Sequence, residues 1–196
     1  MTRTVWAAIG VALGVVIALL ALALWLPGPR AAIPTASGVP EPSSVAASSP
    51  TRTQVGLPDP NRTPGSINPN VTPDNLASTI CLIGWTATVR PPSAYTSALK
   101  VTQILEYGYS DRSPSHYEED HLVPLELGGA PRDPANLWPE PNEIDLPDGT
   151  HVGSESKDHL ENYLHRAVCA GTMSLGDAQR LIAGDWIQAW MSVESP

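Results

Sequence analysis

The chain has 196 residues, a formal net charge of −9 at neutral pH and only two cysteines. Such an acidic balance argues against tight, sequence-independent binding of nucleic acid, which needs clustered basic groups against the phosphates. It leaves open an enzyme whose site carries a metal ion or local basic residues. A nucleic-acid substrate is then expected to bind weakly and to dissociate as the salt concentration rises.

The chain begins with an apolar run at residues 4–26, which holds 23 residues and no charge. This length is enough to cross a bilayer as a helix. Arg3 and the terminal amine precede the run, so the N-terminus is expected to stay in the cytoplasm. A cleaved secretion signal has a shorter apolar core of about 7–15 residues. Residues 1–26 are therefore predicted to be an uncleaved membrane anchor, with a cleaved signal as the alternative. Both place the rest of the chain outside the cytoplasm.

Residues 27–75 contain eleven of the 21 prolines, together with many Ser and Thr and few large apolar residues. This composition predicts a disordered tether that holds a domain away from the membrane. Residues 76–196 remain for the folded part, and about 120 residues is a normal size for one domain with one core. Both cysteines, Cys81 and Cys169, lie inside it. In an exported domain they predict one disulfide, which would stabilise the fold by roughly 2–4 kcal/mol.

The domain mixes elements of both kinds. Residues 78–92 begin apolar and β-rich, whereas residues 93–107 favour a helix that ends at Gly108. Residues 154–170 carry Leu160, Leu164 and Val168 at helical spacing, and a further helix is expected after Ser174. The fold class expected from this pattern is α+β.

The most informative stretch is residues 117–141, YEEDHLVPLELGGAPRDPANLWPEP. Adjacent Asp and His residues, Asp120 and His121, are able to supply a ligand for a divalent cation and a general base at one point. The Gly pair at 128–129 predicts a turn or loop between two short strands.

This stretch resembles the HNH, or ββα-metal, nucleases, which typically show D-H-x-x-P-L-x-x-G-G and then N-L about fifteen residues after the His. It is more similar still to small secreted or membrane-tethered HNH-like proteins that share YEEDHLxPLELGG, NLWPEP, a later K-D-x-x-E and a final C-x-G. The resemblance implies a small ββα-metal core with flanking helices. The matching residues are Asp120, His121, Pro124, Leu125, Gly128, Gly129, Asn136 and Leu137.

The resemblance also implies roles. His121 would be the general base and Asp120 a metal ligand, while Asn136 would tie the loop between the strands and thereby fix the base. Lys157 would contact phosphate or pair with Glu161 at i,i+4. One divalent cation would complete the site, and oxygen ligands favour magnesium or manganese over zinc.

The chain departs from the family at the third ligand. HNH proteins usually place a His or Asn three residues before the helical Lys, and here that position holds Ser154. The candidates to replace it are His151, just upstream, and Asp158 and Glu161 on the helix. Spacing does not choose among them.

Two functions follow as expectations. The first is a membrane-anchored or secreted HNH-like nuclease that hydrolyses phosphodiester bonds of DNA or RNA with one metal ion. The second is a catalytically degenerate envelope domain of the same fold that binds a wall polymer or a protein. The intact register from Asp120 to Asn136 favours the enzyme, and Ser154 with the acidic charge favours the binding domain.

Overall fold

A computed structural model of the chain describes residues 56–194. The predicted anchor at residues 1–26 and the first part of the predicted tether lie outside the described residues. Within residues 56–194, no helix combines the length and the apolar character that crossing a membrane requires.

The described part of the chain is α+β. Its four α-helices are α1 (Trp85–Val89), α2 (Ser93–Glu106), α3 (Ser154–Cys169) and α4 (Leu175–Glu194). Its strands are β1 (Tyr117–His121), β2 (Leu137–Pro141), β3 (Ile144–Asp145) and β4 (His151–Val152). Four 3₁₀ turns complete the order: Pro73–Ser78, Pro114–His116, Leu125–Leu127 and Pro134–Asn136.

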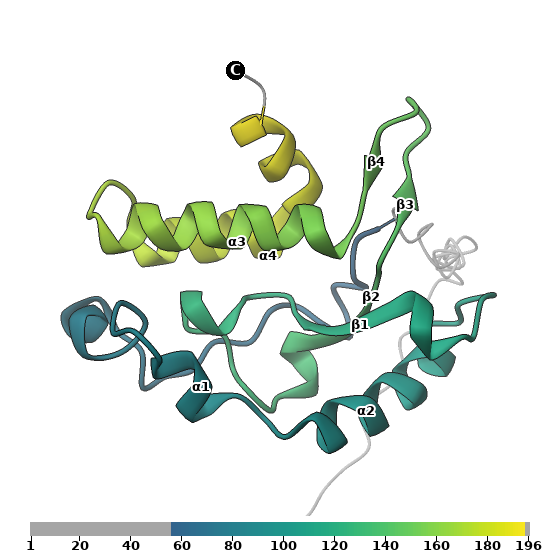
Figure 1. Cartoon of the computed structure of the whole chain (residues 1–196), viewed down its shortest axis with the longest axis horizontal. Helices are drawn as coiled ribbons and strands as arrows, with labels where there is room; N and C mark the ends of the chain where they lie inside the picture. The colour runs from purple at the N-terminus through teal and green to yellow at the C-terminus, as the bar shows by residue number, and fades with distance from the viewer. Residues whose placement is uncertain (1–55, 195–196) are drawn as a thin grey trace, which may run out of the picture. The chain divides into compact units, whose positions relative to one another are not determined.

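The pair β1–β2 lies between two groups of helices (Figure 1). Helices α3 and α4 pack side by side on one side of it, and α2 contacts both strands on the other. The second pair, β3–β4, forms a small hairpin that leads into α3. Both pairs are antiparallel, and in the first one Asp120 faces Trp138 while His121 faces Leu137.

The core forms mainly between α3, α4 and the loop that joins β1 to β2. The helical stripe predicted from the sequence is confirmed, because Leu160, Leu164 and Val168 are all buried. Trp186 from α4 is fully buried beside them. The predicted disulfide is present: Cys81 is bonded to Cys169 at the last residue of α3.

The start of the folded domain differs from the prediction. Residues 56–75, assigned to the tether, instead pack on the folded domain. Thr63 is buried, and its hydroxyl lies 2.6 Å from that of Tyr107 at the end of α2. The amide of Gly65 donates to the carbonyl of Ala135. Composition misleads here because the segment is held largely by backbone hydrogen bonds, which need few large apolar side chains.

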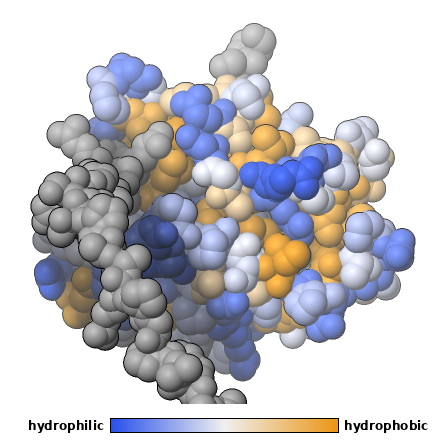
Figure 2. Space-filling view, turned by 180° about the vertical axis from the view of Figure 1, so that it is seen from behind, coloured by the Kyte–Doolittle hydropathy of each residue, from blue (hydrophilic) through white to orange (hydrophobic). Residues whose placement is uncertain are grey.

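The β-rich expectation for residues 78–92 is also wrong. The segment contains a short helix, α1, which begins after Gly84 in the left-handed conformation. Its apolar residues do not form a buried strand, since Ile83 is fully exposed and Leu82 about half exposed. Figure 2 shows hydrophobic and hydrophilic residues interspersed over one face of the molecule.

Candidate active site

Asn136 ties together the loop that joins β1 to β2. Its side-chain oxygen accepts from the amide of Val123 at 2.9 Å, and its side-chain nitrogen donates to the carbonyls of Val123 and Ala130. Gly129 leaves room for this arrangement, because a Cβ atom there would lie 1.7 Å from the Val123 carbonyl oxygen. Asn136 thus fixes the chain just after His121 and is too buried to meet a substrate.

A buried ion network joins β1 to α3. The ammonium of Lys157, which is fully buried, donates to a carboxylate oxygen of Asp120 at 2.6 Å and to the carbonyl of His121 at 3.0 Å. It also donates to Glu161, one helical turn further along α3. Lys157 is therefore a structural cation that holds α3 against the end of β1.

The network holds more acidic groups than one ammonium can neutralise. Glu140 on β2 is also buried, and burial raises its pKa well above the usual range of a carboxyl. Burial raises the pKa of Glu161 to about 8, with Asp120 adding to the effect. Burial alone would lower the pKa of Lys157, but Asp120 and Glu161 raise it above its usual value. The network therefore retains both the lysine charge and protons on carboxyl groups at neutral pH.

His121 faces the other side of the strand pair, where a cleft of about 450 Å³ lies between β1 and α2. Alternate residues of a strand share a face, and Tyr117, Glu119 and His121 line this cleft together with their neighbour Glu118. Two basic residues, Arg90 and Lys100, line it from the α2 side. The cleft therefore combines a histidine with two basic residues and two glutamates.

The hydrogen bonding of His121 sets its tautomer. Its Nε2 lies 3.0 Å from the carbonyl oxygen of Pro131. A carbonyl only accepts, so Nε2 carries the proton and Nδ1 of the neutral ring keeps its lone pair. Burial lowers the pKa of His121 below its usual value, so the ring is neutral at pH 7 and able to accept a proton.

Glu119 is the second titratable group beside the cleft. Both of its carboxylate oxygens are buried and lack a hydrogen-bond partner among the described residues. Burial, and then the neighbouring Asp120, raise its pKa to about 8. Its carboxyl is thus expected to be neutral at pH 7, which limits the negative charge next to His121.

The structure separates the three candidates for the missing metal ligand. Glu161 is bound to Lys157 inside the network. His151 lies on the β3–β4 hairpin, where it pairs with Asp145, and both side chains are more than four-fifths exposed. Asp158 remains as the candidate that no other side chain binds among the described residues, and burial and then the charge of Asp120 raise its pKa.

Glu118 belongs to the same acidic surface. Burial, Asp120 and Asp158 raise its pKa in that order. Carboxylates that repel one another in this way favour a bound cation. However, Asp120 belongs to no group of three close ligand atoms among the described residues. In that part of the chain, the one such group, with ligand atoms within 4.8 Å of one another, is Cys81, His165 and Cys169.

Several of these residues escape prediction from the sequence. Arg90 and Lys100 lie outside the motif and reach the cleft only through the packing of α1 and α2. Glu140 stands in the motif, but its burial follows from the strand register, which pairs it with Glu118. Pairing the two strands on either side of the Gly-Gly turn would have placed Glu140 opposite Glu118 from the sequence alone.

The chain matches no protein-family model, no curated protein and no solved structure, so the chemistry of this site rests on its own residues.

Proposed function

We propose that the chain is an HNH-like phosphodiester hydrolase that acts on DNA or RNA outside the cytoplasm. The observation that carries this proposal is His121: a buried, neutral imidazole beside a cleft, with Nε2–H held by the Pro131 carbonyl and Nδ1 available as a base. The order of elements supports it: the antiparallel pair β1–β2 is followed, after the β3–β4 hairpin, by helix α3.

In this proposal, Nδ1 of His121 takes a proton from the attacking water. Arg90 and Lys100 bind the negatively charged phosphate in the same cleft and offset the acidic field of the rest of the domain. Asn136 and the Pro131 carbonyl keep the ring in place, and Lys157 holds α3 against the strand that carries it.

The oxygen donors proposed for a divalent cation lie on the acidic surface around Asp120, and one of them, Glu118, also lines the cleft. Asp120 uses one carboxylate oxygen for Lys157, and Asp158 and Glu118 add oxygen donors whose mutual repulsion a cation would relieve. Mg²⁺ or Mn²⁺ suits such a set because these ions keep several waters and bind through one or two carboxylates. The cation, when bound, would stabilise charge on the phosphate and on the leaving oxygen. His151 and Glu161 are left out, because each is committed to another partner.

The location outside the cytoplasm is part of the proposal. The disulfide between Cys81 and Cys169 fits an oxidising compartment. The apolar run at residues 4–26 supplies the means of export, either as a retained anchor or as a cleaved signal.

The test is nicking of supercoiled plasmid, and cleavage of single-stranded RNA, by the full-length chain at low salt with Mg²⁺, Mn²⁺ or chelator. We expect metal-dependent cleavage that falls at least about 100-fold in His121→Ala, the usual effect of losing a general base. His159→Ala is the matched control, because His159 is an exposed histidine on α3. Equal loss in both variants, or activity that survives in His121→Ala, contradicts the assigned base.

A second candidate function is an envelope domain that binds a wall polymer or a protein without catalysis. It is favoured by Lys157, whose ammonium already occupies one oxygen of Asp120. Correct folding by circular dichroism, no cleavage with any metal, and co-sedimentation with purified cell-wall polymer would support this function and overturn the first.

A further inference from the structure

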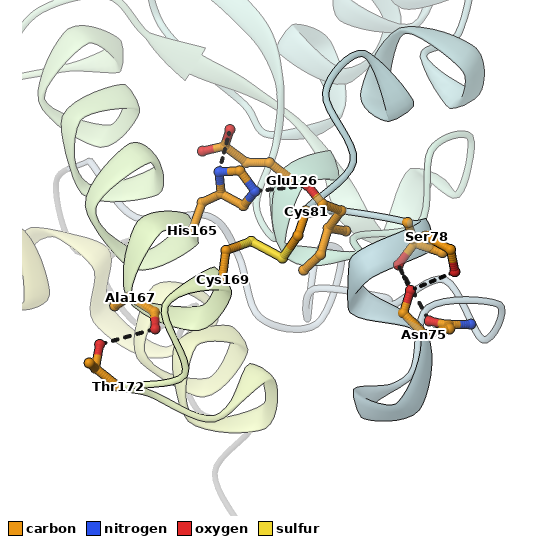
Figure 3. The surroundings of a disulfide bond; sticks show 10 residues. Asn75, Ser78, Cys81, Glu126, His165, Ala167, Cys169 and Thr172 are labelled. Carbon is orange, nitrogen blue, oxygen red and sulfur yellow. Dashed lines mark hydrogen bonds and ion pairs between the residues drawn. A yellow bond between two sulfur atoms is a disulfide. The ribbon is translucent and has the colours of Figure 1, made fainter.

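Two side chains of metal-binding types, His165 and Glu126, lie near the disulfide. The sulfur atoms of Cys81 and Cys169 and a ring nitrogen of His165 all lie within 4.8 Å of one another. Figure 3 shows the His165 ring on α3 beside the disulfide, with one ring nitrogen directed at the carboxylate of Glu126. We propose that, when this disulfide is reduced, the two thiolates, His165 and Glu126 bind one Zn²⁺ ion. This inference is independent of the proposed nuclease activity.

The hydrogen bonding of His165 prepares it as a ligand. Its Nε2 lies 2.8 Å from the carbonyl oxygen of Ile80, which precedes Cys81. Because the carbonyl accepts, Nε2 carries the proton and Nδ1 of the neutral ring keeps a lone pair. Metal-binding histidines almost always donate the other ring N–H to a carbonyl or carboxylate in this way, which fixes both the tautomer and the ring orientation.

Glu126 would supply the fourth position from just outside the group formed by the two sulfur atoms and His165. One of its oxygens lies 3.7 Å from Nδ1 of His165, and the other is buried with no hydrogen-bond partner among the described residues. A nitrogen and an oxygen bound to the same tetrahedral zinc ion lie about 3.4 Å apart, given bond lengths of about 2.1 Å. Nδ1 of His165 and this oxygen of Glu126 therefore need only a small shift to bind one cation together.

The sulfur atoms need the larger movement. Reduction by a dithiol transfers two electrons and two protons: the S–S bond breaks, Cys81 and Cys169 become thiols, and the reductant becomes a disulfide. Zn²⁺ then displaces the two thiol protons. Two thiolates on one tetrahedral zinc ion lie about 3.8 Å apart, and the Cα atoms of the two residues, 5.7 Å apart, allow that separation without moving the backbone far.

The site would hold the domain together when no disulfide is present. Cys81 follows the segment at the start of the domain, and Cys169 ends α3, 88 residues later in the chain. A zinc ion between them closes the same loop as the disulfide. The ligand chemistry is that of zinc, since two thiolates and an imidazole suit Zn²⁺ far better than Mg²⁺ or Mn²⁺.

The test uses the full-length chain in detergent, oxidised or reduced with a metal-free phosphine, titrated with Co²⁺ as a spectroscopic probe and then with Zn²⁺. We expect the reduced protein to bind one equivalent of Co²⁺ with a thiolate-to-cobalt charge-transfer band and the visible bands of a tetrahedral ion, which Zn²⁺ abolishes. The oxidised protein should show none of these bands. His165→Ala should weaken binding at least about tenfold, and Glu126→Gln should weaken it less.

The control is His159→Ala, which removes an exposed histidine from the same helix and should leave Co²⁺ affinity unchanged. Circular dichroism records whether the reduced chain stays folded. The proposal is overturned if the reduced protein does not bind Co²⁺, or if His165→Ala binds it as tightly as wild type. An unfolded reduced chain would bind Co²⁺ through its two cysteines alone, and His165→Ala would then bind as tightly as wild type. Loss of the fold on reduction therefore also counts against the site.

Discussion

The two faces of the β1–β2 pair use charged residues in opposite ways. On the α3 side, Lys157 and the carboxylates around it are buried and bound to one another. On the α2 side, Arg90, Lys100 and His121 line an open cleft together with Glu118 and Glu119. Neighbouring residues of one strand, Asp120 and His121, therefore belong to different environments: the first to a structural ion network, the second to a surface that a ligand can reach.

This difference separates stability from chemistry. A buried ion pair costs much to break, because the partner left behind stays out of water without compensation. A basic residue lining an open cleft costs little to remove, because water replaces its partners. Substitutions on the α3 side should accordingly change folding first, and those on the α2 side should change ligand binding first.

The largest effect is expected for Lys157→Met. Removing the ammonium leaves Asp120 and Glu161 buried without their cation, so the free energy of unfolding should fall by about 3–5 kcal/mol. Urea unfolding of the full-length chain at neutral pH measures it. Lys100→Met is the matched variant across the strand pair and should cost about 1 kcal/mol or less, since Lys100 donates one hydrogen bond to the Tyr117 carbonyl. Equal losses in the two variants would refute the division between the faces.

The next effect is expected for Asn136→Ala. It removes three hydrogen bonds and leaves the polar groups of Val123 and Ala130 buried and unpaired, so unfolding should become easier by about 2–3 kcal/mol. Asn136→Asp keeps the oxygen that accepts from Val123 but loses the donor, and should fall between Ala and wild type. An Asp variant as unstable as Ala would assign the whole effect to the lost donor, the side-chain NH₂ group that binds the carbonyls of Val123 and Ala130.

A smaller effect, visible as pH dependence, is expected for Glu119. Its pKa is about 8 in the folded protein because of burial, against an ordinary value of 4.5. The unfolded chain therefore releases this proton at lower pH than the folded one, and stability should fall as pH rises from about 4.5 to about 8. Glu119→Gln should remove this part of the slope, by roughly 1–2 kcal/mol between about pH 5 and pH 9.

Unfolding measured at both pH values checks this expectation. Glu155→Gln is the control, because Glu155 is exposed on the first turn of α3 and should leave the slope as in wild type. If Glu119→Gln keeps the full wild-type slope, then Glu119 does not carry a raised pKa.

Local patterns predict the α3 side better than the α2 side. The stripe of α3 follows from 3.6-residue periodicity, and the disulfide from cysteine count and export. Lys157 and Glu161 follow from i,i+4 spacing. The cleft does not follow, because Arg90 and Lys100 reach it through the packing of α1 and α2, and no local pattern encodes that packing.

The start of the domain shows the same limit. Residues 56–75 carry the composition of a tether, yet they pair their backbone groups with the loop between the strands. Hydrophobic periodicity reports apolar burial and says little about segments held by main-chain hydrogen bonds. Asn136 bonds within the loop between the strands, whereas Asp120 bonds to Lys157 on α3, a contact that local sequence does not predict.

The smallest effect is expected for His151→Ala. His151 and its partner Asp145 are both highly exposed, and such pairs contribute little to stability. The unfolding free energy should change by no more than about 0.5 kcal/mol. The Mg²⁺ or Mn²⁺ dependence of any cleavage should also stay as in wild type, whereas Asp158→Asn should raise the metal concentration that is needed. If His151→Ala also changes the metal dependence, then His151 is a metal ligand, and the β3–β4 hairpin must move toward Asp120 when the metal binds.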